Sequence, residues 1–168
     1  MNKYAAGMAE TRWLDQREAQ AWRAYIAAQR VVSSRIEQQL QRDAGIPHTY
    51  YEILVRLSEA PGNRLRMSEL AVATQGSRSR LSHAVNRLEQ NGWVKREGIE
   101  SDRRGQVAIL TEVGRQKLVD TAPGHVEEVR RAIFDALTPE QVEHLYDVCA
   151  TLARHSGDTV DRAAWERT

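Results

Sequence analysis

The chain has 168 residues, of which 41% are hydrophobic and 28% charged, so it is long enough for one domain, or for a small domain with an attached oligomerisation element, but short for two large domains. No apolar run approaches the roughly 20 residues that span a bilayer, and residues 1–10 lack the apolar core of a signal peptide, so we expect a soluble, cytoplasmic protein without a membrane partner. The net charge is only +1, and the single cysteine, Cys149, excludes an internal disulfide and agrees with a reducing compartment.

Two helices are predicted in the first third of the chain. Residues 15–43 form a long helix, because their apolar residues recur at helical spacing and Gly45 with Pro47 provides a stop signal. The sequence Thr49-Tyr50-Tyr51-Glu52 has the form of a capping box, in which a hydroxyl and a carboxylate three residues later satisfy free N–H groups. We therefore expect a second helix to begin at Thr49 and to end at Pro61-Gly62.

Residues 67–90 are predicted to form a helix-turn-helix. A short helix over Met67–Ala73 places Leu70 and Ala71 inward, residues 74–77 form a turn, and a longer helix runs from about residue 78 to residue 90. Asn91-Gly92 ends this second helix, because glycine adopts the left-handed conformation of a C-cap. Arg66 stands where a Ser or Thr often caps the first helix, so the start of that helix stays open at this point.

The polar face of the helix over residues 78–90 suits the major groove of DNA. At 100° per residue, Leu81, Val85 and Leu88 form the buried stripe. The opposite face and its flanks carry small polar, amide, imidazole or guanidinium side chains, with no acid between residues 78 and 87: Arg78, Ser79, Arg80, Ser82, His83, Asn86, Arg87 and Gln90. Of these, Ser79, Arg80 and His83 are expected to contact bases, and Arg78 and Arg87 phosphates. Taken alone, the same face is also compatible with a solvated helix surface without function.

A basic β-hairpin is predicted after this helix. Trp93, Val94 and Lys95 begin its first strand, residues 102–105 combine turn chemistry with positive charge, and residues 107–110 suit a half-buried strand. In extended backbone Asp102 and Arg104 point to the same side, where they can pair. Arg96 and Arg103 would add phosphate contacts. The alternative is a surface ion pair without function, which contributes under about 1 kcal/mol.

The last third of the chain is predicted to be helical. Thr111 caps a helix in which Ala122-Pro123-Gly124 marks either a kink or a break into two pieces, and Thr138-Pro139-Glu140-Gln141 starts the last helix. The apolar stripe of that helix contains Leu145, Val148, Cys149 and Leu152, and burial of Cys149 there would suppress its reactivity. The five histidines (48, 83, 125, 144 and 155) and Cys149 show no metal-ligand spacing, so neither a metal nor another cofactor is expected.

The charges are unevenly distributed along the chain. Residues 1–63 have a net charge of +1, residues 64–104 of +4 and residues 105–168 of −4. A basic middle segment indicates a surface for a polyanion, although an ordinary uneven surface is the alternative.

Four residues carry a family resemblance. Asp102, Arg104, Leu110 and Thr111 match the signature DxRxxxxxLT, and with the order of helices over residues 13–156 the chain resembles the MarR (multiple antibiotic resistance regulator) family of dimeric winged-helix repressors. The resemblance implies a mostly α fold with a small β-hairpin wing. It implies the following division: a flexible tail at 1–12, a helical dimerisation region at 13–47 and 112–157, a winged helix-turn-helix DNA-binding domain at 48–111, and a frayed tail at 158–168.

The resemblance also implies roles for single residues. Arg104 would enter the minor groove while Asp102 holds it in place, and a narrow minor groove attracts a guanidinium by its concentrated negative potential. Dimer contacts would include Leu145, Val148 and Leu152. Family members commonly sense a small aromatic or phenolic ligand between the dimerisation helices and the winged helix, where the candidate residues are Trp22, Tyr25, His48 and Tyr51, for which a role in the core is the alternative. Cysteine-based peroxide sensing is disfavoured, because the first helix contains no cysteine.

We therefore predict a homodimeric transcriptional repressor that binds double-stranded DNA at an inverted-repeat operator, with half-sites about 34 Å apart, and that responds to a small ligand. One alternative is a winged-helix protein-interaction module without DNA binding, whose DNA affinity would be weak and insensitive to salt. An enzyme is not expected, because the chain has no nucleophile elbow, P-loop, GxGxxG or HExxH motif. The apolar stripes of the terminal helices could instead close the core of a single chain.

Overall fold

The chain folds into a mostly helical structure with one small antiparallel sheet. A computed structural model describes residues 11–74, 77–99 and 102–155, without the side chains of Arg103 and Arg104. In this part of the chain the elements are α1 (Gln16–Ala44), α2 (His48–Glu59), β1 (Arg64–Arg66), α3 (Met67–Ala73), α4 (Arg78–Gln90), β2 (Val94–Ile99), β3 (Asp102–Leu110), α5 (Glu112–Ala132) and α6 (Pro139–His155), with short 3-10 turns at Pro61–Asn63 and Phe134–Ala136. None of the described helices combines the length and apolar character needed to cross a bilayer.

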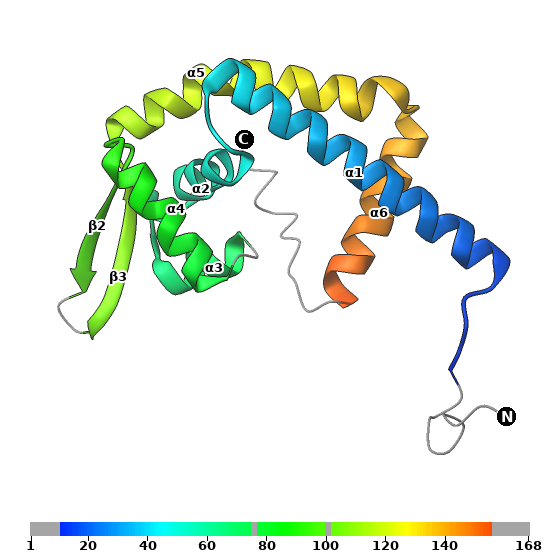
Figure 1. Cartoon of the computed structure of the whole chain (residues 1–168), viewed down its shortest axis with the longest axis horizontal. Coiled ribbons are helices and arrows are strands. Elements are labelled where there is room, and N and C mark those ends of the chain that lie inside the picture. Colours follow the sequence, from blue (N-terminus) through cyan, green and yellow to red (C-terminus); the bar gives the residue numbers. More distant parts are fainter. Residues whose placement is uncertain (1–10, 75–76, 100–101, 156–168) are drawn as a thin grey trace, which may run out of the picture.

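The two longest helices, α1 and α5, form an arch, and the other elements lie below it (Figure 1). Helices α1 and α5 run side by side, α2, α3, α4 and the hairpin of β2 and β3 lie under one end, and α6 descends from the other end. This arrangement separates a winged helix-turn-helix from the region that holds α6.

The ends of α1 confirm the prediction, whereas the start of α2 corrects it. Asp15 accepts a hydrogen bond from the Glu18 N–H at 2.8 Å, and Gly45, with φ of 67°, ends α1 in the left-handed conformation. The predicted capping box at Thr49 is wrong, because α2 begins one residue earlier. Pro47 occupies the N-cap position, and a carboxylate oxygen of Glu37 on α1 accepts the His48 N–H at 2.9 Å. The cap comes from another helix, which local sequence does not reveal.

Helices α3 and α4 have the predicted bounds, and their inward residues close the main core. The start of α3 that the sequence left open is fixed by Glu69, whose carboxylate accepts the Arg66 N–H at 3.0 Å. The Ser77 hydroxyl caps α4 by accepting the Arg80 N–H at 3.3 Å, and Gly92, with φ of 72°, follows its end. The core residues come from α2, α3, α4 and the sheet: Ile53, Leu54, Leu57, Leu70, Ala71, Leu81, Ala84, Val85, Leu88, Val94, Ala108 and Leu110.

The sheet has a third strand that the sequence did not predict. The strand order is β1-β3-β2, and Leu65 of β1 lies opposite Ala108 of β3, which in turn lies opposite Arg96 of β2. A strand of three residues with two arginines is too short to show alternation. The predicted turn at residues 102–105 is also corrected, because these residues belong to β3.

Helix α5 is continuous, and α6 begins as predicted. The Thr111 hydroxyl caps α5 by accepting the Gly114 N–H at 3.0 Å, and Pro123 lies inside the helix without breaking it into two. Thr138 and Gln141 cap α6 reciprocally, at 2.9 Å and 3.3 Å. Cys149 is exposed in the single chain, because α6 packs only weakly against the other described elements. Residues 1–10 of the predicted tail at 1–12, and the predicted tail at 158–168, lie outside the described residues.

Candidate DNA-binding surface

Helix α4 presents one buried face and one exposed face. Leu81, Val85 and Leu88 are at most 3% exposed, as the helical wheel predicts. The predicted contact residues that lie on the solvent side and are exposed are Arg78, Ser79, Arg80, Ser82, His83 and Arg87. Asn86 is half-buried, and its side-chain oxygen has no hydrogen-bond partner among the described residues. The exposed face therefore offers donors and acceptors without an acidic group among them.

An open groove of about 610 Å³ separates this face from the first turn of α2. Its lining residues are Pro47, Thr49, Tyr50, Arg80, His83, Ala84, Asn86, Arg87 and Gln90. The Arg87 guanidinium donates to the Gln90 side chain at 3.1 Å, so it is held one turn from the C-terminal end of α4. Guanidinium groups along such a groove suit the phosphate backbone of a duplex.

A second cavity, of about 330 Å³, lies between α4 and the wing formed by β2 and β3. It is lined in part by Arg66, Arg78, Ser82 and Asp102, and a guanidinium nitrogen of Arg66 lies 3.8 Å from a carboxylate oxygen of Asp102. The predicted pairing of Asp102 with Arg104 falls on a side chain outside the described residues, as does the predicted contact of Arg103. Sequence reasoning missed Arg66 as a neighbour of Asp102, because only the pairing of β1 with β3 brings the two together.

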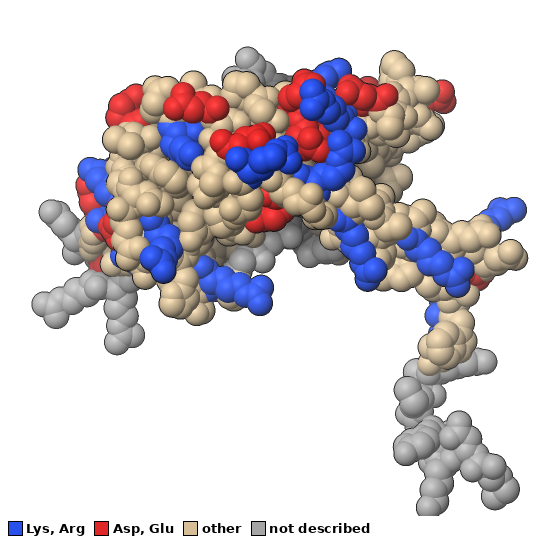
Figure 2. Space-filling view, turned by 45° about the horizontal axis from the view of Figure 1, so that its top comes forward, with Lys and Arg blue, Asp and Glu red and all other residues tan. Residues whose placement is uncertain are grey.

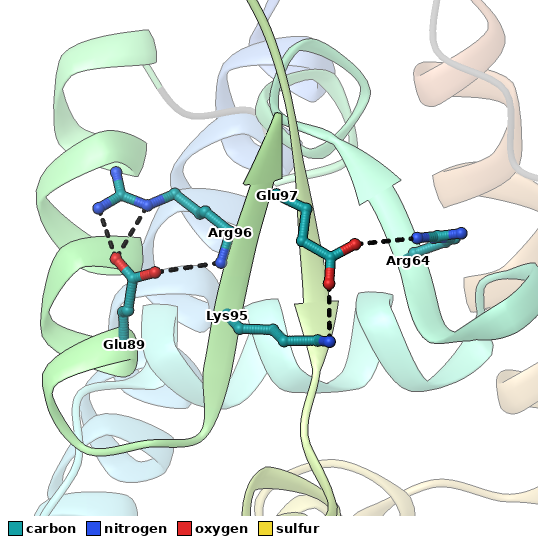
Figure 3. A network of polar contacts seen from close by, with 5 residues as sticks. All are labelled: Arg64, Glu89, Lys95, Arg96 and Glu97. Carbon is teal, nitrogen blue, oxygen red and sulfur yellow. Dashed lines mark hydrogen bonds and ion pairs between the residues drawn. The ribbon is translucent and has the colours of Figure 1, made fainter. Parts of the chain in front are cut away.

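Arg96 does not extend toward solvent as a phosphate contact would. Its Nε donates to a carboxylate oxygen of Glu89 at 3.0 Å, its backbone N–H donates to the other oxygen at 3.1 Å, and its Nη2 contacts Glu89 as well (Figure 3). These hydrogen bonds lower the pKa of Glu89 below its usual value, because they stabilise the carboxylate. In the chain without DNA, Arg96 is thus paired with Glu89: α4 and β2 each contribute one partner, and no local sequence signal joins them.

A separate charged row crosses the opposite face of the sheet. Lys95 donates to Glu97 at 2.7 Å, and Arg64 of β1 lies 3.4 Å from the other carboxylate oxygen of Glu97 (Figure 3). These cations lower the pKa of Glu97, with the hydrogen bond from Lys95 as the main cause. The row is exposed, so its effect on stability is small.

Acidic and basic side chains are unevenly distributed over the face of the molecule that Figure 2 shows. In Figure 2 the acidic side chains lie mostly over the arch of α1 and α5, where they alternate with basic ones, while Lys and Arg side chains project from the lower side of the molecule.

Comparison with known proteins identifies the family. The sequence model of the MarR family matches residues 44–105. Sco3205, a MarR family transcriptional regulator from Streptomyces coelicolor whose crystal structure contains DNA, is 53% identical, and the match covers 88% of this chain and 92% of that chain with a TM-score of 0.83. This chain belongs to the MarR family. It is a transcriptional regulator, and the family is not one of enzymes.

Two further MarR-family relatives agree with this assignment. AbsC from Streptomyces coelicolor is 46% identical, with coverage of 86% of this chain and 97% of that chain and a TM-score of 0.80. The transcriptional repressor MprA from Escherichia coli (strain K12) is 32% identical over 108 residues, which are 64% of this chain and 61% of that protein. The fold and the order of elements thus agree with those of other MarR regulators.

The four residues proposed for a MarR-type ligand pocket fall into two groups. Trp22 and Tyr25 lie 6.0 Å apart in the first half of α1, and both are exposed. His48 and Tyr51 of α2 instead surround His125 of α5, with ring centroids 6.3 Å and 4.4 Å away. Because Tyr25 precedes the end of α1 by about 28 Å of helix, the two groups do not meet within one chain.

The group around His125 is the more enclosed of the two. Tyr51 is 7% exposed, and burial raises its pKa. Burial, together with the charge of His48, lowers the pKa of His125, and its Nδ1 has no hydrogen-bond partner among the described residues. This group connects α2 of the DNA-binding domain to α5 of the helical region.

Proposed function

We propose that the protein is a homodimeric repressor that binds a pseudo-palindromic operator and is released by a small aromatic or phenolic ligand. The observation that carries this proposal is the exposed face of α4, which has arginines and no acid and lies beside the wing. Support comes from Sco3205, which is 53% identical and was crystallised with DNA, and from the name of MprA as a repressor.

In this proposal α4 reads bases in the major groove. Ser79, Arg80 and His83 lie toward its N-terminal half and are exposed, so they can approach base edges. Arg78 and Arg87 stand at the two ends of the helix and bind phosphates, which fix the register of the protein on the duplex. Asn86 and Ser82 complete the contact surface.

The wing reads the adjacent minor groove. Arg104 inserts its guanidinium, Asp102 orients it, and Arg103 binds a phosphate. Substitution of Arg104 by Ala is therefore expected to weaken operator binding while the dimer stays intact. Unchanged affinity in a titration would remove the wing from the proposal.

Dimerisation uses the exposed apolar side chains of α6. Leu145, Val148 and Leu152 are 39%, 58% and 51% exposed, although they form one stripe at helical spacing. A two-fold dimer would bury these residues against their copies and would set the spacing of two half-sites at about 34 Å.

An effector would act by favouring a dimer whose recognition helices do not match that spacing, because a ligand of equal affinity for both states shifts nothing. NadR, which shares this fold at 23% identity, has been crystallised with 4-hydroxyphenylacetate. A comparable small phenolic compound is the class we propose here, and the cluster of His48, Tyr51 and His125 is a candidate contact.

Selection of bound sequences from random DNA tests the proposal. We expect an inverted repeat to be recovered, and the logarithm of the affinity for it to fall steeply with the logarithm of the salt concentration, because each neutralised phosphate releases counterions. Binding that is insensitive to salt and no tighter than to a scrambled duplex would instead favour a winged-helix protein-interaction module.

A further inference from the structure

We infer that Glu89 and Arg96 form a brace that holds the wing at a fixed position relative to the recognition helix α4, and that this brace determines which bases the wing reads next to each half-site. The inference rests on the proposed DNA-binding function and adds to it two positioning residues that do not touch DNA themselves. Neither is a base or phosphate contact in this account.

The contacts of the brace are directional. Both carboxylate oxygens of Glu89 are occupied, one by the backbone N–H of Arg96 at 3.1 Å and the other by its guanidinium, with the Nε at 3.0 Å. The side chain of Arg96 is only 26% exposed and that of Glu89 36%, so this pair is better shielded from solvent than the other described ion pairs of the sheet. Three hydrogen bonds that use both carboxylate oxygens define an orientation, whereas a single exposed ion pair does not.

The strand register explains why Arg96 faces α4. Arg96 lies opposite Ala108, and Ala108 lies opposite Leu65, so all three share the face of the sheet that packs on the core. Lys95 and Glu97, its neighbours in β2, lie on the opposite face (Figure 3). The guanidinium therefore has α4 as its partner, although the charge alone suggests a DNA contact.

The brace contacts β2 beyond the point where the wing joins α4. The root of the wing is held by the Trp93 N–H, which donates to Leu88 at 2.9 Å, and by the Thr111 N–H, which donates to Trp93 at 3.0 Å. The pairing of β2 with β3 shifts register between Gly98 and Ile99. Arg96 lies between this root and the irregularity, where a contact with α4 limits rotation of the outer part of the hairpin.

The consequence concerns spacing within a half-site. Helix α4 and the wing read successive grooves in the proposed complex, so the distance between them decides which base pairs meet the wing. Loss of the brace would let the wing sample several positions. The wing would then discriminate less between base pairs in the flanking minor groove, while the bases read by α4 would stay the same.

The test compares the full-length wild type with Glu89→Gln, Arg96→Gln and the double variant. Each is titrated with duplexes that differ either in the half-site core or in the flanking base pairs, at several salt concentrations. We expect each single variant to lose about fivefold in discrimination between flanks, the lower end of what one base pair contributes. The double variant should lose no more than either single variant, because all three lack the same contact. Core discrimination and salt dependence should stay at the wild-type level.

A direct phosphate contact by Arg96 would give the opposite pattern. Glu89→Gln would then strengthen binding, since it removes a negative charge and frees the guanidinium, and Arg96→Gln would lower the salt slope by about one ion. That result would overturn the inference. Unchanged flank discrimination in all three variants would overturn it as well.

Matched controls come from the opposite face of the same sheet. Glu97→Gln and Lys95→Gln remove the same charges from an exposed pair that does not touch α4, and they should leave flank discrimination unchanged. If Glu89→Gln fails to fold, Arg96→Lys keeps the charge without the two adjacent guanidinium donors and should give a smaller loss in the same direction. A wild type that binds no inverted repeat would refute the proposed function itself, whereas normal wild-type binding with unaltered variants would refute the brace alone.

Discussion

His83 projects from the middle of the exposed face of α4, about one turn after Arg80 and one turn before Arg87. A neutral imidazole has one donor and one acceptor, and it can therefore distinguish base edges, whereas a guanidinium at the rim of the groove binds phosphates of any sequence. The same helix face thus combines a residue suited to specificity with residues suited to affinity.

Substitution of His83 by Ala should relax sequence preference more than it lowers affinity for random DNA. Arg87→Ala should weaken binding to all duplexes by a similar factor and lower the salt slope by about one. Titrations of both variants against operator and scrambled duplexes at several salt concentrations measure the two effects. An equal loss on both duplexes for His83→Ala would place His83 among the phosphate contacts.

Gly114 shows how a single residue fixes one element against another. A Cβ at this position would lie 2.1 Å from the Trp93 carbonyl oxygen and 2.9 Å from the Leu110 side chain, so the first turn of α5 could not approach the root of the wing. We expect Gly114→Ala to lower the free energy of unfolding by about 2 kcal/mol or more, as overpacking does. Urea unfolding measures the loss. Gly98→Ala is the control, because nothing lies within 4 Å of its Cβ position, and equal losses in the two variants would contradict the steric account.

At the scale of elements, helix ends that depend on neighbouring residues can be predicted from the sequence, whereas contacts between elements distant in the chain cannot. The end of α3 and the extent of α4 are predicted correctly, because Asn91 and Gly92 end α4 within their own turn, whereas the start of α3 was left open at Arg66. Strand β1 could not be predicted, since three residues form a strand only because β3 offers its edge. In the same way, the exposed face of α4 was visible in the sequence, but the partner of Arg96 was not, because Glu89 belongs to another element.

The junction of α2 and α5 should make stability depend on pH. Burial and the charge of His48 lower the pKa of His125 below its usual 6.5, so the unfolded chain binds this proton more readily than the folded one. The stability associated with neutral His125 is therefore complete above about pH 6.5 and decreases as the pH falls toward the lowered pKa of the folded state.

The prediction is that His125→Phe, which keeps a ring against Tyr51, loses less stability than the wild type between about pH 7.5 and about pH 5.5. Urea unfolding at the two pH values provides the measurement. His144→Gln, at an exposed position on α6, should keep the wild-type dependence. If His125→Phe and the wild type lose the same stability, His125 does not contribute to the pH dependence.

At the scale of the molecule, one helix end connects the two halves. The Lys117 ammonium donates to the Ala44 carbonyl at the end of α1 with 2.8 Å and lies 5.4 Å from the centre of the Trp93 ring at the root of the wing. Lys117 of α5 therefore contacts both the end of α1 and the root of the wing.

The exposed apolar stripe of α6, at the other end of the molecule, is where the proposed dimer can be tested. Leu145→Asp and Val148→Asp place a carboxylate on the exposed apolar stripe of α6, where the dimer would have to bury it without a partner. We expect both variants to be folded monomers by sedimentation and to lose about 100-fold or more in affinity for the full operator, because each half-site is then bound independently. Affinity for an isolated half-site should stay close to that of the wild type.

A control on the same helix separates assembly from a general effect of charge. Glu143 lies about 160° from Leu145 around α6, so Glu143→Lys changes the charge of the helix on the face away from the stripe. This variant should remain dimeric and keep its affinity for the inverted repeat. If Leu145→Asp stays dimeric, the stripe is not the interface. If it is monomeric and still binds the full operator as tightly as the wild type, two-fold recognition is not the source of affinity, and the exposed face of α4 acts as a single unit.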